Sequence, residues 1–164
     1  MSQYSDKTRR PRRHSYSPRG GAEPQYDHEV LEIARVVRVV KGGRRFSFRA
    51  SVVAGDRLGR VGLGLGKSRD VQAAIQKAYN QAVKNMVRVT LADGTLPHTV
   101  DAKFKGAHVS LRPARPGTGI IAGGTVRIVA DLAGVTNVVS KRRGSANKVS
   151  NARAALLALA KTHR

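Results

Sequence analysis

Alternating apolar side chains near the start of the chain predict a β-hairpin. Residues 30–41 are rich in β-branched side chains, and residues 44–54 carry apolar side chains at every second position from Phe46 onward. The dipeptide Gly42-Gly43 separates the two runs, and glycine adopts the positive φ of a tight hairpin turn without strain. Two antiparallel strands joined by a Gly-Gly turn are therefore expected.

A third strand and a helix follow the hairpin. A tight connection at residues 56–59 (DRLG) leads to residues 61–66, where apolar side chains alternate with glycine. Residues 71–87 carry apolar side chains at i, i+3 and i+4 spacing, which is typical of an amphipathic helix. Ser68 is the expected N-cap, and the helix dipole favours the Asp70 carboxylate in the first turn. The pattern predicts a three-stranded antiparallel sheet with one face covered by one helix.

The second half of the chain alternates strand and helix patterns. A Pro/Gly-rich loop interrupts it, and Gly134 follows one helix pattern at the position where helices commonly end with a left-handed residue. This alternation predicts a two-layer α/β unit, so the whole chain is expected to be an α+β protein. The expected elements are strands at residues 98–104 and 108–112, a helix over 125–133, a strand over 135–139 and a final helix over 147–162.

Composition divides the chain into three parts. Residues 1–28 contain three prolines and four arginines at positions 9–13, with almost no aliphatic side chains. Such a segment buries too little apolar surface to offset its ordering entropy, so a disordered basic arm is expected there. A transit peptide is the alternative, although Asp6 and the prolines oppose the amphipathic helix that it requires. Two folded domains are expected, over residues 29–96 and 97–164.

The charge of the chain indicates a polyanionic partner. The sequence has 31 Lys+Arg against 10 Asp+Glu, a formal net charge of +21, which repels itself in free solution. Nucleic acid is the natural partner, and an anionic membrane surface is the lesser alternative because no long helix combines a basic face with large apolar side chains. Aromatic residues make up only 4% of the chain, so phosphate and shape contacts are expected to dominate over base stacking.

Basic side chains gather at the expected turns, where they reach a phosphate backbone without being desolvated. Most of them are arginines, whose planar guanidinium fits phosphate oxygens in a bidentate manner. The Lys141–Arg143 triplet is expected in a loop, as a second place for phosphate contact, with a solvated charge run as the alternative. The expected RNA-binding residues are Arg35, Arg38, Lys41, Gly42, Gly43, Arg44, Arg45, Arg49, Arg57, Arg60, Lys67, Arg69, Lys141, Arg142 and Arg143.

Enzymatic chemistry is not indicated by any motif. Gly66-Lys67-Ser68 is similar to the end of a phosphate-binding loop, but that pattern requires glycine where Val61 stands. Residues 117–122 spell G-x-G-x-x-A, yet prolines precede them and no acidic residue ends a second parallel strand. The histidines lack metal-ligand spacing, and the absence of cysteine excludes thiol nucleophiles and thiolate zinc sites. No enzyme activity, cofactor, metal or small-molecule substrate is expected.

Several blocks of sequence together resemble the bacterial family of small-subunit ribosomal protein S-five. The blocks are VKGGRRFSF, VAGDRLGRVGLGLGKSRDVQAAIQKA, DGTLPH, PGTGIIAGG and LAGVTNV, in that order over residues 30–162. The resemblance implies an N-terminal domain like a double-stranded-RNA-binding domain without its first helix, and a C-terminal α/β domain of the family's own type. It also implies a protein of the cytoplasmic ribosome that binds small-subunit ribosomal RNA and contributes to subunit assembly, decoding accuracy and the channel through which messenger RNA enters.

The resemblance also assigns roles to two segments. In the family, hairpin residues influence spectinomycin resistance, which here implies a role for Val36, Val37, Arg38, Lys41 and Gly42. The expected protein neighbours are ribosomal proteins S-four and S-eight, with S-four facing the Pro/Gly-rich loop and the helix after it. The apolar pair at residues 120–121 is either core or interface. The expected protein-interface residues are Gly117, Thr118, Gly119, Ile120, Ile121 and Arg127.

A free-standing double-stranded-RNA binder that acts off the ribosome is the alternative function. It would share the basic hairpin and the small sheet. It would not need a second domain that combines cations with an apolar loop.

Overall fold

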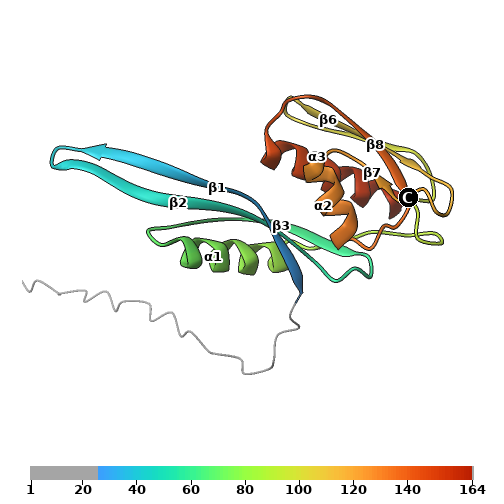
Figure 1. Ribbon diagram of the computed structural model, residues 1–164, viewed down its shortest axis with the longest axis horizontal. Coiled ribbons are helices and arrows are strands. Elements are labelled where there is room, and N and C mark those ends of the chain that lie inside the picture. Colours follow the sequence, from blue (N-terminus) through green and yellow to red (C-terminus); the bar gives the residue numbers. More distant parts are fainter. Residues whose placement is uncertain (1–25, 164) are drawn as a thin grey trace, which may run out of the picture.

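Two four-stranded sheets and three helices make up residues 26–163, the part of the chain that the computed structural model describes (Figure 1). The arm expected over residues 1–28 lies outside this part, except that β1 already begins at Asp27. The expected α+β class is confirmed. In chain order the elements are β1 (Asp27–Val40), β2 (Gly43–Gly55), β3 (Arg60–Ser68), α1 (Val71–Lys84), β4 (Val87–Arg88), β5 (Val100–Phe104), β6 (Ala107–Pro113), β7 (Ile120–Ile121), α2 (Gly124–Leu132), β8 (Val138–Gly144), α3 (Lys148–Ala160) and the 3₁₀ turn η1 (Lys161–His163).

The first sheet is antiparallel, with strand order β1-β2-β3-β4. The three expected strands are present, and the short β4 adds a fourth beside β3. β1 and β2 pair along their whole length, whereas β3 reaches only to the Phe48–Ser68 pair. Beyond that pair the hairpin continues as a two-stranded ribbon that projects from the molecule (Figure 1). β2 begins at Gly43 (φ 118°), so the turn residues are Lys41 and Gly42 and not the expected Gly42 and Gly43.

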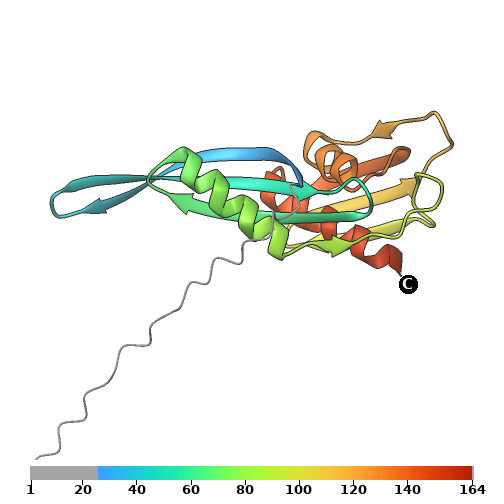
Figure 2. The same cartoon turned by 90° about the horizontal axis from the view of Figure 1, so that it is seen from below.

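Helix α1 lies across one face of the first sheet (Figure 2) and touches β3 at backbone distance. A Cβ at Gly62, Gly64 or Gly66 would lie 2.2, 1.9 or 2.1 Å from a carbonyl oxygen of α1. The buried residues of the helix are alanines, which complete this close approach from the other side. The alternation of glycine along β3 therefore sets the distance between helix and sheet.

The ends of α1 differ from the sequence prediction. The Asp70 carboxylate accepts a hydrogen bond from the Ala73 N–H at 3.0 Å, so Asp70 is the N-cap and the expected Ser68 is not. Ser68 instead ends β3, because it pairs with β2. The helix stops at Lys84, and Val87, which the periodicity placed in the helix, belongs to β4.

The second sheet has strand order β5-β6-β8-β7, with β7 parallel to β8 and the other pairs antiparallel. The expected hairpin of β5 and β6 is present. β8 runs from Val138 to Gly144, so the Lys141–Arg143 triplet lies in a strand and not in the predicted loop. β7 occupies part of the Pro/Gly-rich segment that was also expected to be a loop. Both strands form because β6 and β8 supply backbone partners that are remote in sequence.

Helices α2 and α3 cover the inner face of the second sheet and lie between it and the first sheet (Figure 1). Gly134 (φ 85°) ends α2 as expected, because its N–H donates to the Asp131 carbonyl at 2.9 Å. The Val135 N–H donates to the Ala130 carbonyl at 3.0 Å and completes a Schellman motif. Asn147 is the N-cap of α3.

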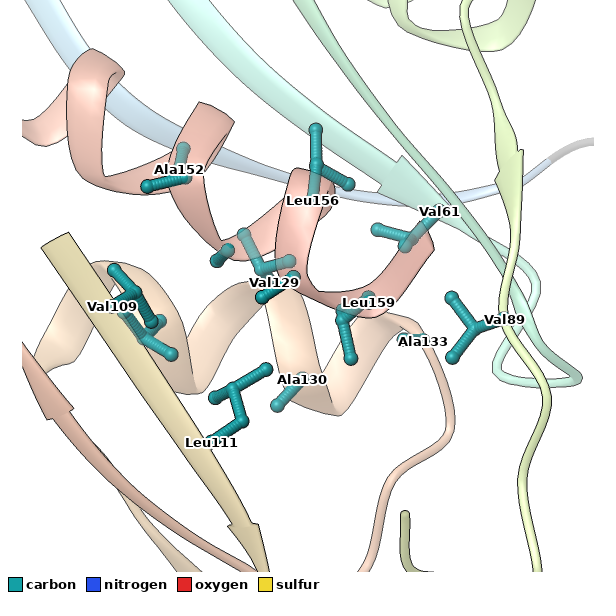
Figure 3. Close-up of a cluster of buried hydrophobic side chains, with 14 of the residues drawn as sticks. Val61, Val89, Val109, Leu111, Val129, Ala130, Ala133, Ala152, Leu156 and Leu159 are labelled. Carbon is teal, nitrogen blue, oxygen red and sulfur yellow. The ribbon is translucent and has the colours of Figure 1, made fainter. Parts of the chain in front are cut away.

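One cluster of buried apolar side chains runs through both halves of the chain. Val61 of β3 packs in the same cluster as Val129 of α2 and as Leu156 and Leu159 of α3 (Figure 3). A smaller cluster lies between the first sheet and α1. The proposed domain boundary after residue 96 therefore separates two sheets but not two cores.

Backbone hydrogen bonds join the two halves at the DRLG connection. The Arg57 N–H donates to the Leu132 carbonyl, and the Gly59 N–H donates to the Ala133 carbonyl, each at 3.1 Å. A Cβ at Gly134 would lie 2.1 Å from the Arg57 carbonyl oxygen, so only glycine fits this approach. The end of α2 is thus held directly against the turn between β2 and β3.

Candidate nucleic-acid interface

Basic side chains line the face of the first sheet that is opposite to α1. Arg38 pairs with Arg45 across β1 and β2, and Arg49 pairs with Lys67 across β2 and β3. α1 lies on the other face, because Gly66, the neighbour of Lys67, approaches a carbonyl oxygen of the helix. We call these four basic residues the basic face. All four side chains are exposed.

The basic face places like charges opposite each other. Two cations about 7 Å apart in water repel by roughly 0.6 kcal/mol, and like charges directly opposite on neighbouring strands are destabilising. Among residues 26–163, ion pairs with another described residue form only at Arg57 and Arg60. The described chain therefore supplies no counter-ion to the basic face, and an external anion would relieve its repulsion.

The basic face leads into a groove between the two halves of the chain. The groove has a volume of about 220 Å³ and is lined by Arg49, Phe104, Lys105, Arg153 and the start of α3. The Arg153 guanidinium carbon lies 5.3 Å from the centroid of the Phe104 ring, and the Lys105 Nζ lies 6.0 Å from it. These cation–π contacts hold two cations of the second half beside one of the first.

The expected cations of the hairpin divide between its tip and its two faces. Lys41, the two glycines after it and Arg44 are exposed at the tip. Arg35 lies on the α1 side of the sheet, where its guanidinium carbon stands 3.7 Å from the centroid of the Phe46 ring. Arg69 is exposed just before α1. These residues can reach an anion at the tip or the edges of the hairpin but do not extend the basic face.

Two of the expected RNA-binding arginines are engaged within the chain. Arg57 Nε lies 3.2 Å from Asp27 Oδ2, and Arg57 Nη2 lies 3.7 Å from Asp131 Oδ2. Arg60 Nε lies 4.0 Å from Asp56 Oδ2. Both arginine side chains are more than half exposed, so each pair contributes at most about 1 kcal/mol to stability. The contact of Arg57 with Asp131 links the two halves, whereas the Arg60 pair lies within the connection between β2 and β3.

Strand β8 separates the members of the basic triplet. Lys141 and Arg143 lie on the outer face of the second sheet. Arg142 is opposite the buried Val109 and therefore lies on the other face. Its Nε lies 3.7 Å from the position that a Cβ at Gly123 would take. The triplet is thus not one charge cluster.

The segment expected to face a neighbouring protein is partly exposed. Ile120 packs against the core, whereas Ile121 is 53% exposed, so the two isoleucines divide between core and surface. Arg127 Nη2 donates to the Ile120 carbonyl at 2.9 Å. Ile120 and Arg127 line a hollow of about 450 Å³ that also reaches Asp131.

Sequence reasoning missed the two cations that the second half adds to the groove. Lys105 stands at the turn between the two expected strands, so the criterion that selected the hairpin cations also selects it. Arg153 occupies an exposed position of the final helix, and such cations are common on solvated helix faces. Arg153 differs from other exposed basic residues on helices only because α3 packs beside the first sheet and brings it near Arg49.

Neither a metal-ligand cluster nor a membrane-spanning helix occurs among the described residues. Within residues 26–163, no three His, Asp or Glu side chains gather as metal ligands would. Every helix in this range is too short or too polar to cross a membrane. The chemistry that the site supports is electrostatic binding of an anion.

Comparison with known proteins covers nearly all of the described chain. The family profile described as "Ribosomal protein S5, N-terminal domain" matches residues 26–90, and the profile "Ribosomal protein S5, C-terminal domain" matches residues 102–164. The chain is 51% identical over 138 residues to the small ribosomal subunit protein uS5 of Treponema pallidum, covering 84% of this chain and 80% of that one. It is 52% identical over 136 residues to uS5 of Tolumonas auensis (83% and 82%) and 47% identical over 137 residues to uS5 of Thermus thermophilus (84% and 85%).

Proposed function

Because the chain belongs to the ribosomal protein uS5 family, whose members are structural, non-enzymatic constituents of the small ribosomal subunit, we propose that it binds small-subunit ribosomal RNA through its basic face. The observation that carries the proposal is the pairing of Arg38 with Arg45 and of Arg49 with Lys67. Phosphate groups neutralise such opposed cations, and arginine binds them in a bidentate manner. The protein acts on the cytoplasmic ribosome.

The groove extends the proposed contact across the molecule. Lys105 and Arg153 stand beside Arg49, so one RNA backbone that follows the basic face also meets cations of the second half. With few aromatic side chains, the protein reads the shape of folded RNA and not its base sequence. This mode suits a structural role in subunit assembly.

The projecting hairpin gives the proposed interface its reach. Its two-stranded part covers about five residues of each strand, or roughly 17 Å at 3.4 Å per residue. A narrow ribbon of this length enters a groove or junction of folded RNA. The residues with a proposed role in spectinomycin response, Val36, Val37, Arg38, Lys41 and Gly42, all lie in this ribbon or its turn.

Contacts with proteins are proposed at the other end of the molecule. The exposed Ile121 and the hollow beside Arg127 support the segment from Gly117 to Ile121 as the surface for ribosomal protein S-four. Ribosomal protein S-eight is the second proposed neighbour. Placement beside the channel through which messenger RNA enters, and an influence on decoding accuracy, follow from the same proposal.

Charge reversal on the basic face tests RNA binding. The full chain with Arg38→Glu and Arg45→Glu is compared with wild type for binding of a labelled small-subunit ribosomal RNA transcript, by filter binding between about 50 and 200 mM KCl. Loss of two phosphate contacts is expected to weaken binding about tenfold or more and to lower the slope of log affinity against log salt by about two. Lys77→Glu with Lys84→Glu is the matched control, because it makes the same charge change on exposed positions of α1.

Equal loss in the two double variants would show that only net charge matters and would refute the basic face as the binding site. Sedimentation separates the ribosomal role from that of a free-standing RNA binder. The ribosomal role requires stoichiometric protein in small subunits washed at high salt. Protein found only in the unbound fraction contradicts it.

A further inference from the structure

The outer face of the second sheet carries a set of basic side chains that strand register brings together. Residues paired across antiparallel strands share a face, and every second residue along a strand returns to it. Lys103, His108 and Arg143 form one row across β5, β6 and β8. Asp101, Ser110 and Lys141 form the next row, and Arg112 pairs with Val139 in the row beyond.

This face is not covered by the described chain. Helices α2 and α3 lie against the inner face, where Ala102, Val109, Leu111 and Val138 are buried. On the outer face Lys103, Arg112, Lys141 and Arg143 are exposed. A hollow of about 190 Å³ lies among Ser110, Arg112, Val139, Ser140, Lys141 and Arg143. The face therefore combines open access, a shallow concavity and convergent cations.

The charge balance of the face favours an anionic partner. Its only carboxylate among the described strand residues is Asp101, which accepts a hydrogen bond from the Ser110 hydroxyl. Lys103 and Arg143 are in the same row, and no ion pair to another described residue neutralises either of them. The centre of a protein–protein interface is depleted of charge, whereas four cations dominate here. These rows contain no Phe, Tyr or Trp, and their one aromatic ring, the His108 imidazole, is half-buried, so the face offers phosphate contact more than base stacking.

We propose that the outer face of the second sheet is a second RNA-binding surface, which holds the phosphate backbone of small-subunit ribosomal RNA through Lys103, Arg112, Lys141 and Arg143. The inference rests on the proposed function, because it names a further contact with the same RNA. The basic face and this surface belong to different sheets, with α2 and α3 between them (Figure 1). The protein therefore contacts RNA on two sides and links two RNA segments.

The test uses the full chain and the same labelled transcript, with variants that differ in strand face. Arg143→Glu is expected to weaken binding about fivefold and to lower the salt slope by about one. Arg142→Glu makes the same charge change one residue away on the opposite face of β8, and is expected to weaken binding less. Asp101→Asn removes the one carboxylate of the surface and is expected to tighten binding two- to threefold. Tighter binding cannot result from a folding defect.

The outcomes separate the two proposals. Arg45→Glu on the hairpin reports on the basic face alone. One outcome refutes the second surface and leaves the proposed function standing. In that outcome Arg45→Glu weakens RNA binding, Arg143→Glu and Arg142→Glu have the same RNA affinity, and Asp101→Asn binds as wild type does. If Arg45→Glu also leaves binding unchanged, the proposed function falls as well. If Arg143→Glu binds RNA normally but fails to enter reconstituted small subunits, the surface binds a protein and the inference is overturned.

Discussion

The glycine stripe of β3 gives a sharp prediction for stability. In Gly64→Ala, the new Cβ would lie 1.9 Å from the Ala78 carbonyl oxygen and 2.5 Å from the Ala82 nitrogen. Both atoms belong to the backbone of α1, so no side chain can rotate away from the clash. Helix and strand must separate by about 1.5 Å to reach the 3.4 Å of an ordinary contact.

The loss of stability follows from the packing contacts that are weakened when α1 moves away from the sheet. A gap of 0.5–1 Å already forfeits about a quarter to a half of the dispersion energy of each contact. The buried Ala74 and Ala78 would lose such contacts against Ala50 and Val52. Overpacking typically costs about 1–3 kcal/mol and more where the backbone cannot yield. We expect a loss of about 3 kcal/mol, which lowers the melting temperature of a chain of this length on the order of 10 °C.

Urea and thermal denaturation followed by far-UV circular dichroism measure this loss. Gly124→Ala is the matched control, because Gly124 begins α2 and a Cβ there meets nothing within 4 Å. That variant is expected to be neutral or up to about 1 kcal/mol more stable, since alanine favours a helix over glycine. If Gly64→Ala unfolds within about 1 kcal/mol of wild type, the close approach of α1 to β3 is not what holds the helix, and the reasoning fails.

Two further predictions concern side chains that hold backbone N–H groups. Asp56 Oδ1 accepts hydrogen bonds from the Leu58 and Arg60 N–H groups, each at 2.8 Å. Asp56→Ala should therefore lower the free energy of unfolding, measured by urea titration, by about 1.5–3 kcal/mol. Asp56→Asn keeps an acceptor oxygen and should lower it by less. Equal loss in both variants would contradict a role for the acceptor oxygen. Asn147→Ala removes the N-cap of α3 and should lower the free energy of unfolding by about 1 kcal/mol. Asn147→Asp keeps a capping oxygen and should be about as stable as wild type. An alanine variant as stable as wild type would contradict the role of Asn147 as the cap.

Elements with strong local periodicity were predictable from the sequence. The hairpin, α1 and α3 each carry a repeat of apolar positions that depends on neighbours a few residues away. Gly134 was identified as the end of α2 on the same local grounds. The prediction failed at Ser68, because two candidate caps stand two residues apart and only strand pairing shows that Ser68 belongs to β3.

β8 and β7 could not be predicted in the same way. The triplet Lys141–Arg143 shows no alternation of apolar and polar side chains, so nothing local marks it as a strand. It becomes one because β6 pairs with it residue by residue. The faces of its side chains follow from that register, which is why one charge run divides between two surfaces.

The candidate site was predictable in kind but not in arrangement. The basic side chains at the turns are exposed, as expected, because a charged side chain at a turn stays in contact with water. Arg57 satisfied the same criterion, yet its partners Asp27 and Asp131 come from β1 and α2. Nothing in the sequence indicated that Arg153 would lie in the groove beside Arg49. In each case the deciding neighbour is remote in sequence.

The shared core has a consequence for how the protein is made. Val61 and Leu63 of β3 are buried in a cluster that includes Leu156 and Leu159 of α3. Translation proceeds at about 5–20 residues per second, so the roughly 96 residues between Leu63 and Leu159 take on the order of 5–20 s. During that interval the nascent N-terminal sheet has apolar side chains without their partner. A chain truncated before α3 would therefore be prone to aggregation, and quality control would meet it as an incomplete product.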